Sequence, residues 1–424
     1  MRILYVWDAD YPWDVRVEKI CNSLVGNGHE MHIASRNRAR RPVTEALPEG
    51  TVHRMPSWSA LPASLDSWTS FPAFCNPRWL LHLDRTVQRV RPSALIVRDL
   101  PLAPTAIHVS RKHGVPVILD MAENYPAMIR DIWTARRQRP WDVLVRNPRM
   151  VKQVERWCVR RVDQTLVVVE ESGTRLQTEY GLAADRMSLV SNTPPLSRVS
   201  ALPKIHTSDR PLEVVYLGIM ETPRGVLELL EAQQILRSSG VRVRIRLIGD
   251  GRDLELFKAR AGELGLTPDD VQFTGRIQRH EDALALVNRA DVGVVPYQAS
   301  ETWQSTIPNK IFDYMAAGLA VVTSDVAPCK RILHESGAGV VFRAGDAADL
   351  ARVLAKLCDA AYRTMLGENG RRAILSRHNW ERDTTELLSA LHRVESSRSS
   401  ARNNVPEVTI AGALPATEFT VAGS

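Results

Sequence analysis

Residues 305–325, STIPNKIFDYMAAGLAVVTSD, combine residue types that could bind an anion. Pro308 suits the first turn of a helix, because its missing N–H would have no partner there. The free amides of such a turn, with the positive end of the helix dipole, favour a phosphate. Lys310 adds a positive charge, and Asp313, one turn later, could accept hydrogen bonds from a ribose. Each feature alone fits an ordinary helix start, but together they favour a nucleoside diphosphate.

A second candidate for phosphate binding lies in residues 216–230, YLGIMETPRGVLELL. A strand is expected to end at Gly218, and Arg224 then opens a helix. A guanidinium binds phosphate oxygens through two parallel hydrogen bonds, so Arg224 is a candidate for the same diphosphate. The alternative is a surface arginine at a helix start. Gly249 and Gly275 end two further expected strands, in LIGDGRDLELF and FTGRI, and are weak signals by themselves.

These residues need parallel strands to bring them together, and the chain has the required pattern. Short apolar runs alternate with segments of helical periodicity, which predicts parallel sheets covered by helices on both faces. The expected strands of the first half are 2–7, 30–35, 94–99, 115–121, 164–169 and 187–192. Those of the second half are 212–218, 243–250, 271–275, 292–297, 320–325 and 339–343. The predicted fold class is α/β, with two doubly wound, Rossmann-like domains.

The alternation is interrupted at residues 192–211, where the sequence NTPPLSRVSALPKIHTSDRP is rich in Pro and Ser. We therefore predict a first domain at 1–195, a linker at 196–211 and a second domain at 212–377. Residues 396–424 contain many Ser and Ala, which is typical of a disordered tail. Ligands bind beyond the carboxyl ends of parallel strands, so two such domains would form their site in the cleft between them.

Composition argues against several other classes of protein. The chain has 424 residues, more than one domain usually holds, and 44% of them are hydrophobic, as in an ordinary soluble protein. Its five cysteines show no C-x-x-C spacing, which argues for a reducing compartment and against a disulfide framework or a zinc site. The first residues, MRILYVWDADYPW, predict a strand and a turn rather than a signal peptide. No run of about 18 apolar residues is present, so we expect a cytoplasmic protein.

Positive charge is concentrated in residues 130–161. Ten Arg and Lys residues there face three acidic ones, so this segment carries a net charge equal to the +7 of the whole chain. Trp133, Trp141 and Trp157 are interleaved with these charges. One interpretation is a solvated helix face, and the other is a surface that binds anionic lipid or a lipid-linked acceptor. Nucleic-acid binding is not expected, because no recognised motif accompanies the charge.

Several motifs of the second half resemble, in order and spacing, the donor-binding half of glycosyltransferase family 4. They are VVYLG followed by RGVLELLEA, then RLIGDG, VQFTGRIQRHEDALALVNRADVGVVPY and PNKIFDYMAAGLAVVTSD. The first half agrees through DVRVEKICNSLVGNGHEMHIAS and VERWCVRRVDQTLVVVEES. Residues 368–391 resemble the terminal helices of the family, the last of which, about 378–395 here, usually returns to the first domain. The resemblance covers residues 1–395 and implies the GT-B fold, two Rossmann-like domains facing each other across a cleft.

Enzymes of this family transfer a sugar from a nucleotide-diphosphate donor, without a bound metal or cofactor and usually with retention. The resemblance implies that Arg224 and Lys310 stabilise the charge that develops on the leaving diphosphate, as protein cations must when no metal is present. Asp313 falls at the ribose-binding acid of the family, and uracil or guanine would meet backbone groups at 275–277. The remaining donor-binding candidates are Gly218, Gly249, Gly275, Arg276, Ile277, Glu301, Ser305, Pro308 and Asn309.

The chain departs from the family pattern at three positions. Many members carry two glutamates separated by seven residues, but Ser305 stands where the first would be, and Glu301 is the nearest upstream acid. Ile219 replaces the usual Arg after the strand-end glycine. Ala122, in DMAEN, replaces a His of the first domain. Glu123 beside it is a catalytic candidate that could face the cleft or could instead cap the following turn.

The acceptor-side candidates come from the first domain. Asp14 and Arg16 follow the first strand, where the family keeps its acceptor loop, although the usual glycine pair is missing. Asp14 could equally be the N-cap of the following helix. Asp99, in VRDLP, ends a strand that faces the cleft and could bind acceptor hydroxyls or cap the next helix.

The sequence therefore predicts a glycosyltransferase that moves a sugar from a UDP- or GDP-linked donor to a glycan or lipid-linked acceptor. Its expected place is the synthesis of a surface polysaccharide or lipopolysaccharide at the inner face of the membrane. Two alternatives stay open, a nucleotide-sugar epimerase of the same architecture and a catalytically inactive relative that binds the nucleotide. The sugar, the base, the acceptor and the oligomeric state leave little trace in one sequence.

Overall fold

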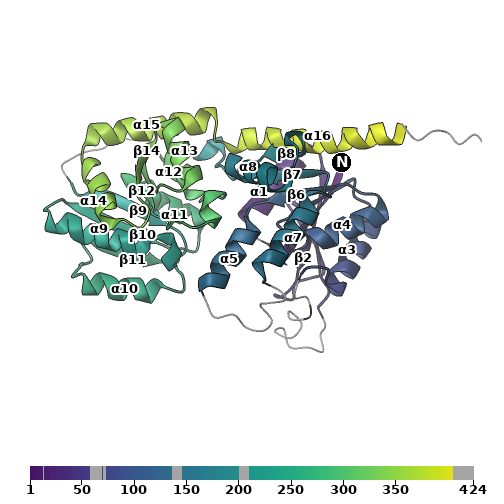
Figure 1. Ribbon diagram of the computed structural model, residues 1–424, viewed down its shortest axis with the longest axis horizontal. Coiled ribbons are helices and arrows are strands. Elements are labelled where there is room, and N and C mark those ends of the chain that lie inside the picture. The colour runs from purple at the N-terminus through teal and green to yellow at the C-terminus, as the bar shows by residue number, and fades with distance from the viewer. Residues whose placement is uncertain (13, 58–68, 70–72, 136–145, 200–209, 404–424) are drawn as a thin grey trace, which may run out of the picture.

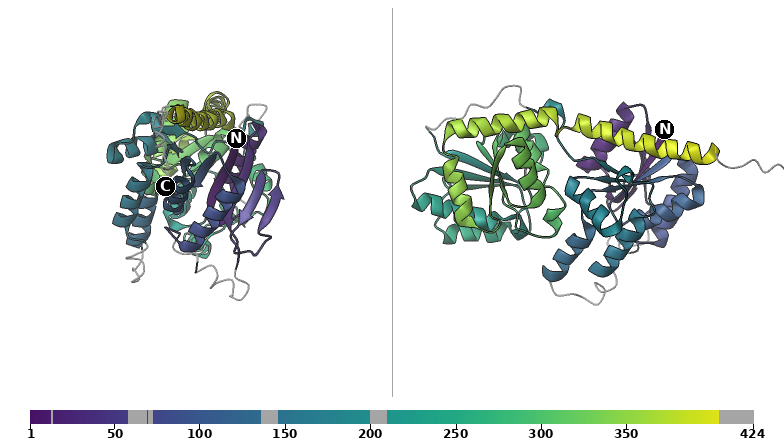
Figure 2. Two further views of the ribbon diagram at one scale, coloured as in Figure 1. Left: turned by 90° about the vertical axis from the view of Figure 1, so that its right-hand side faces the viewer. Right: turned by 45° about the horizontal axis from the view of Figure 1, so that its top comes forward.

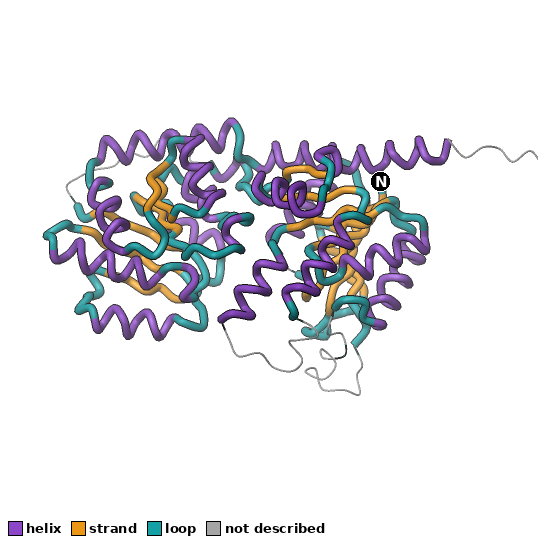
Figure 3. Tube along the Cα trace, viewed as in Figure 1, coloured by secondary structure: helices purple, strands orange, loops and turns teal. Residues whose placement is uncertain are grey.

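The protein folds into two α/β domains, and its last helix crosses from the second domain back to the first (Figure 1). The computed structural model describes residues 1–403 apart from residue 13 and residues 58–68, 70–72, 136–145 and 200–209. Helices surround a central sheet in each domain (Figure 3). The prediction of an α/β fold with two doubly wound domains is therefore confirmed.

The first domain contains an eight-stranded sheet in the order β3-β4-β2-β1-β5-β6-β7-β8. All its neighbouring strands are parallel except β3, which is antiparallel to β4. In the centre of the sheet Ile3 pairs with Ala94, and all five residues of β6 are buried, as expected for a parallel sheet with helices on both faces. The strands are β1 (Arg2–Asp10), β2 (Glu30–Arg36), β3 (Thr44–Leu47), β4 (Gly50–Arg54), β5 (Ala94–Arg98), β6 (Val117–Met121), β7 (Gln164–Val167) and β8 (Met187–Leu189).

The hairpin β3–β4 at the edge of this sheet is absent from the strands predicted above. Its sequence, TEALPEGTVHR, contains charged residues and lacks the apolar run by which the buried strands are recognised. The hairpin depends on Gly50, whose φ is 139°. A Cβ at Gly50 would lie 2.5 Å from the carbonyl oxygen of Met31, so only glycine lets the turn lie this close to β2.

The helices of the first domain begin at clear sequence signals. Asn76 and Asn147 each cap a helix by accepting a hydrogen bond from a backbone amide, and each is followed by proline at the first helical position. The described helices are α1 (Val15–Gly26), α3 (Pro77–Val90), α4 (Ala103–His113), α5 (Tyr125–Ala135), α7 (Pro148–Val159), α8 (Glu170–Tyr180) and the short 3-10 helices η1 (Ala184–Arg186) and η2 (Leu196–Arg198). Residues 196–199 of the predicted linker are therefore partly 3-10 helix.

The second domain contains a six-stranded, fully parallel sheet in the order β11-β10-β9-β12-β13-β14. Its strands are β9 (Leu212–Leu217), β10 (Val243–Ile248), β11 (Val271–Gly275), β12 (Val292–Val295), β13 (Ala320–Ser324) and β14 (Gly339–Phe342). Its helices are η3 (Thr222–Arg224), α9 (Val226–Ser238), α10 (Leu254–Glu263), α11 (His280–Val287), η4 (Thr302–Gln304), α12 (Lys310–Ala316), α13 (Ala327–Ser336), α14 (Ala347–Lys356) and α15 (Ala360–Ser376).

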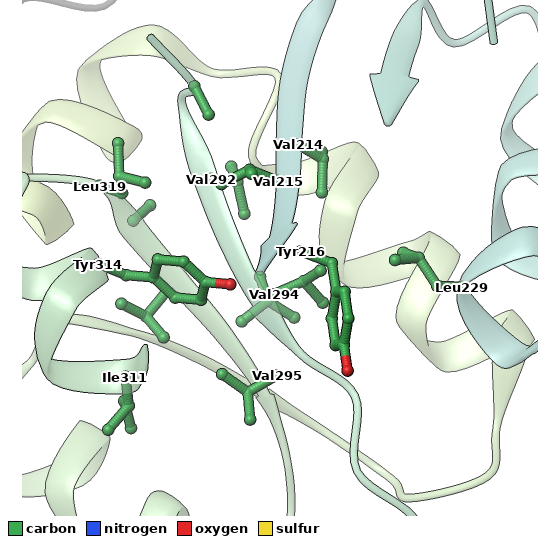
Figure 4. Close-up of a cluster of buried hydrophobic side chains, with 14 of the residues drawn as sticks. Val214, Val215, Tyr216, Leu229, Val292, Val294, Val295, Ile311, Tyr314 and Leu319 are labelled. Atoms are coloured by element: carbon green, nitrogen blue, oxygen red, sulfur yellow. The ribbon is translucent and has the colours of Figure 1, made fainter. Parts of the chain in front are cut away.

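The core of the second domain holds α12 directly against the sheet. Gly293 of β12 pairs with Val215 of β9, and the ring of Tyr314 of α12 packs onto the sheet at Gly293 (Figure 4). The Tyr314 hydroxyl accepts a hydrogen bond from the amide of Leu217 at 2.9 Å, which ties α12 to the end of β9. A Cβ at Gly293 would lie 2.2 Å from the Tyr314 ring, so glycine is needed for this close packing.

The last helix, α16 (Trp380–Asn403), lies along the first domain (Figure 2). Its apolar residues join the core formed by β1 and α1, and the indole of Trp380 donates a hydrogen bond to Ser23 Oγ at 2.7 Å. The predicted tail at 396–424 begins too early, because the helix continues to Asn403. Residues 404–424 lie outside the described part of the chain. None of the helices that the structure describes is long and apolar enough to cross a membrane.

Candidate active site

Three neighbouring strands of the second sheet end at, or are followed by, a glycine. Gly218, Gly249 and Gly275 follow or end β9, β10 and β11, with φ angles of 152°, 139° and 68°. The amide of Gly218 donates to the carbonyl of Ile248 at 2.9 Å, and that of Gly249 donates to the carbonyl of Gly275 at 3.1 Å. A Cβ at Gly249 would lie 1.9 Å from the carbonyl oxygen of Gly218. The glycines therefore allow a close approach of backbone to backbone, and they leave this edge of the sheet without side chains.

The Lys310 ammonium lies buried over this backbone. Its Nζ contacts the rings of Tyr216 and Tyr297, at 4.1 and 5.1 Å from their centroids. A Cβ at Gly218 would lie 2.4 Å from Nζ. No described residue forms a hydrogen bond with this Nζ. Burial, together with the charge of Arg224, holds the pKa of Lys310 well below its usual value. A buried amine without an acceptor is costly, and a bound anion would supply the missing partner.

The start of α12 contributes less to anion binding than the sequence suggests. This helix has only seven residues, so its dipole is small. Pro308 is buried, and Asn309, which is exposed, does not cap the helix with its side chain. The amides of Ile311 and Phe312 are already bonded to the carbonyls of Pro308 and Asn309. The positive charge at this position therefore comes from the Lys310 side chain rather than from free amides.

Arg224 precedes its helix instead of opening it. It ends the 3-10 turn η3, and Gly225, with a φ of 74°, leads into α9. Its guanidinium packs against a pair of touching aromatic rings, 4.9 Å from the centroid of Tyr297 and 4.7 Å from that of Trp303. Nη1 also donates a hydrogen bond to the Tyr297 hydroxyl at 2.8 Å. The sequence analysis missed both aromatic residues, which lie in a loop and have no periodic signal.

Asp313 lies one turn after Lys310 on α12 and is partly exposed. It is near enough to the first domain to act on Lys19 of α1. Burial lowers the pKa of Lys19 to about 7, and the negative charges of Asp383 and Asp313 oppose that shift. Arg276, which is exposed, directly follows the glycine that ends β11, and Ile277 after it is partly buried.

Glu301 and Ser305 contact the opposite domain. Glu301 forms an ion pair with Arg130 of α5. Ser305 is buried, and its hydroxyl accepts a hydrogen bond from Asn124 Nδ2 at 2.7 Å, while its carbonyl accepts one from the Ser172 hydroxyl. Both predicted donor-binding side chains therefore have partners in the first domain, and their roles in binding the donor stay predictions.

Glu123 lies in the cleft, immediately after β6. The residue is exposed to solvent, although protein atoms crowd the surroundings of its carboxylate. This partial removal from water raises the pKa of Glu123 to about 7, and the negative charge of Asp99 adds to the shift. Arg98 and, from the second domain, Arg224 oppose it. A pKa of about 7 suits Glu123 for proton transfer near neutral pH.

Asp99 supports the loop that carries Glu123. It is 5% exposed, and its Oδ1 accepts hydrogen bonds from the amides of Ala122 at 2.9 Å and Glu123 at 3.2 Å. Its φ is 56°, which brings its side chain under the loop after β6. The next helix, α4, has Leu102 at its N-cap and no side-chain cap. The predicted role of Asp99 as a helix cap is therefore wrong, and its binding of acceptor hydroxyls stays a prediction.

Asp14 and Arg16 also have structural partners. Asp14 caps α1 by accepting from the amides of Arg16 and Val17, both at 3.0 Å, which is the alternative considered for it above. Arg16 is 2% exposed, and its guanidinium forms an ion pair with Asp120 at 2.6 Å and donates to the Val190 carbonyl at 2.9 Å. A side chain this buried does not face an acceptor, so the acceptor-side prediction for Arg16 is wrong.

The sequence analysis missed Arg98 as a residue of the cleft. It ends β5, lies 3.3 Å from Asp14 and 3.4 Å from Asp99, and packs over the ring of Trp7 at 5.0 Å. Its only signal in the sequence was its position at the carboxyl end of a buried strand. Within the described part of the chain, no cluster of three or more His, Cys, Asp or Glu side chains could hold a metal ion.

Comparison with known protein families shows which family the chain belongs to. Residues 14–193 match the family model described as "Glycosyl transferase 4-like domain", and residues 211–360 match "Glycosyl transferases group 1". The chain belongs to glycosyltransferase family 4. The two matched regions correspond to the two sheets described above, and the glycosyltransferase motifs named from the sequence lie in them.

Curated relatives of this glycosyltransferase have several activities. The glycogen synthase of Mycobacterium tuberculosis is 23% identical over 402 residues, which cover 90% of this chain and 92% of the relative. A phosphatidyl-myo-inositol mannosyltransferase of Mycolicibacterium smegmatis is 32% identical over 142 residues, 33% of this chain and 34% of the relative. These relatives support a glycosyltransferase that uses a nucleotide-sugar donor.

Solved structures confirm the GT-B fold. The sucrose-phosphate synthase of Thermosynechococcus elongatus superposes with a TM-score of 0.75 at 16% identity and covers 93% of this chain and 99% of its own. The Anabaena protein HepE in complex with UDP superposes with a TM-score of 0.70 at 13% identity, covering 92% of this chain and 100% of its own. The prediction of two Rossmann-like domains facing a cleft is therefore correct.

Proposed function

We propose that this glycosyltransferase takes a sugar from a UDP- or GDP-linked donor, with retention at the anomeric carbon and without a metal or other cofactor. The observation that carries the proposal is the buried Lys310 Nζ, which has no hydrogen-bond partner among the described residues and lies over the backbone at Gly218. Arg224 adds a second cation within the same domain. Together they form a site for the two phosphates of a nucleoside diphosphate.

In this proposal the bond between the anomeric carbon and the diphosphate oxygen breaks while the acceptor oxygen bonds to the same carbon. Negative charge then develops on the leaving diphosphate, and Lys310 and Arg224 stabilise it. Glu123, with a pKa of about 7, takes the proton of the acceptor hydroxyl. Asp313 accepts hydrogen bonds from the ribose, and the base lies against the backbone at 275–277.

We further propose that the acceptor is a glycan or a lipid-linked sugar of surface polysaccharide synthesis, reached at the inner face of the membrane. The support is the basic character of α7, which has three cationic residues against one acidic one and lies next to α5 (Figure 1). Trp157 is 37% exposed, with the Arg161 guanidinium 4.6 Å from its ring, and Met150 is 46% exposed. Such a surface suits anionic lipid. Of the segment 130–161, residues 136–145 lie outside the described residues.

The donor proposal is tested by thermal shift of the full chain with UDP, GDP, dTDP, ADP and CMP. A ligand present at about 100 times its dissociation constant stabilises the fold by about 2.7 kcal/mol. A shift with one diphosphate, lost in Lys310→Ala and Arg224→Ala, supports the phosphate site and names the base. A chain that binds none of these nucleotides does not have the proposed activity.

An inactive nucleotide-binding relative is the second candidate. Ser305, at the position of a family glutamate, is hydrogen-bonded to the first domain, and Ala122 supplies no side chain that could replace the family histidine. Hydrolysis of the bound nucleotide sugar, or its transfer to any acceptor, distinguishes the two functions. A chain that binds the donor and never releases the sugar is the inactive relative.

A further inference from the structure

A five-residue loop of the second domain holds the first domain. Residues 301–305, here called the contact segment, include the 3-10 turn η4, and several of their side chains point to α5 and the loop before it. Ser305, the last residue of the segment, is buried by this contact. The contacts are Arg130 with Glu301, Asp131 Oδ2 with Thr302 Oγ1 at 2.6 Å, and Asn124 Nδ2 with Ser305 Oγ at 2.7 Å.

Trp303 in the middle of the same segment points the other way, into its own domain. Its ring lies 4.4 Å from that of Tyr297 and 4.7 Å from the Arg224 guanidinium. Arg224 thus packs against both rings of this pair, and the Tyr297 hydroxyl also accepts a hydrogen bond from it. An aromatic ring attracts a guanidinium, so removing the Trp303 ring takes away one of the contacts that hold the Arg224 side chain in this position.

The contact segment therefore links the contact between the two domains to the position of the Arg224 side chain. Its flanking residues bind the first domain, and its central residue, Trp303, packs against the Arg224 guanidinium. We propose that Trp303 is a positioning residue for Arg224, held in place when the contact segment binds the first domain. The inference rests on the proposed function, because it gives Arg224 the role of binding the diphosphate. Contact between the domains then completes the diphosphate site, so that the site is best formed when the domains are together.

On the side of the first domain, the contact with the segment lies next to Glu123, the proposed general base. Asn124, which binds Ser305, directly follows Glu123 in the chain. The Asn124 side chain also accepts a hydrogen bond from the amide of Ala127 at 3.2 Å, so it is fixed at the start of α5. The hydrogen bond between Asn124 and Ser305 thus joins the loop that carries Glu123 to the segment that positions Arg224.

The test is isothermal titration of the full-length protein with UDP and GDP, and with UMP and GMP. The measured quantity is the affinity ratio between the diphosphate and its monophosphate, because Arg224 acts on the additional phosphate. In Trp303→Ala this ratio is expected to fall by about two- to thirtyfold, the range of one cation–π contact. Trp303→Phe keeps a ring beside Arg224 and should restore most of the ratio. The double variant Thr302→Val/Ser305→Ala should lower the ratio although neither side chain touches Arg224.

Two comparisons separate this inference from a general effect of domain contact. Glu171→Gln weakens another contact between the domains, the ion pair with Arg331 at 2.7 Å, which involves no side chain of the contact segment and should leave the ratio unchanged. In an Arg224→Ala background, Thr302→Val/Ser305→Ala should have no further effect. An unchanged ratio in the double variant, or an equal loss in Glu171→Gln, overturns the inference while leaving the proposed function intact. Failure of the unaltered chain to bind either diphosphate overturns the proposed function itself.

Discussion

Replacing Lys310 by methionine should stabilise the empty protein and weaken its binding of nucleotide. Methionine keeps the length and the apolar contacts of the lysine stem, and it removes the buried nitrogen that has no hydrogen-bond partner among the described residues. An unsatisfied buried polar group costs about 1–3 kcal/mol. The substitution also loses the contacts of Nζ with the rings of Tyr216 and Tyr297, and this loss reduces the stabilisation by about 0.5–1 kcal/mol. We expect the free energy of unfolding to rise by about 1–2 kcal/mol.

The same substitution should weaken the binding of the diphosphate, although it stabilises the empty protein. A hydrogen bond to a charged group contributes about 1.5–3 kcal/mol, so the affinity for the diphosphate is expected to fall about 10- to 150-fold. The stability difference should also depend on pH. Because the folded-state pKa of Lys310 is lowered, the unfolded chain binds more protons in the interval between the folded and unfolded pKa values. The unaltered protein therefore gains stability as the pH rises through that interval, and Lys310→Met lacks this slope.

Urea denaturation of the ligand-free protein at several pH values measures the free energy of unfolding and its pH dependence. Titration with UDP and GDP measures the affinity for the diphosphate. Lys330→Met is the matched control, because Lys330 is exposed on α13 and its substitution should change stability by less than about 0.5 kcal/mol. The reasoning is refuted if Lys310→Met is less stable than the unaltered chain without ligand. It is also refuted if the variant binds the diphosphate with unchanged affinity.

Three further predictions follow from individual contacts. Gly293→Ala should destabilise the fold by about 1–3 kcal/mol in urea denaturation, because its Cβ would lie 2.2 Å from the tyrosine ring on α12, whereas Gly262→Ala, with nothing within 4 Å, should be neutral or stabilising. Asp99→Asn keeps the acceptor for the two loop amides and removes a negative charge, so the pKa of Glu123 should fall below about 7, seen as a shift of the pH–rate profile to lower pH. Burial raises the pKa of Asp383 to about 6, so the folded state binds more protons than the unfolded chain between about pH 4 and 6, and stability should fall by about 2–3 kcal/mol as the pH rises through that range. This loss should be absent in Asp383→Asn, and an equal loss in the variant would contradict the assignment.

Much of the fold could be predicted because its strands are short, apolar and evenly spaced. Buried parallel strands such as β6 and β9 carry apolar residues on both faces, and this composition is visible without any knowledge of their neighbours. The hairpin β3–β4 could not be recognised in this way, because β3 lies at the edge of the sheet and alternates between exposed and partly buried residues. The end of α16 was placed too early for a similar reason, since polar residues continue an exposed helix without an apolar signal.

The sequence by itself determined the α/β class, the two doubly wound domains, the family, and the cations Arg224 and Lys310 as phosphate candidates. These depend on local patterns, namely strand composition, turn residues and motif spacing. Only the tertiary structure decided what each candidate side chain contacts. Arg16 is bound to Asp120, and Asp99 holds the loop of Glu123, because strands distant in sequence end at the same edge of a sheet. Those partners come from elements that the sequence does not place relative to one another, and burial beside them sets the charge state of each group.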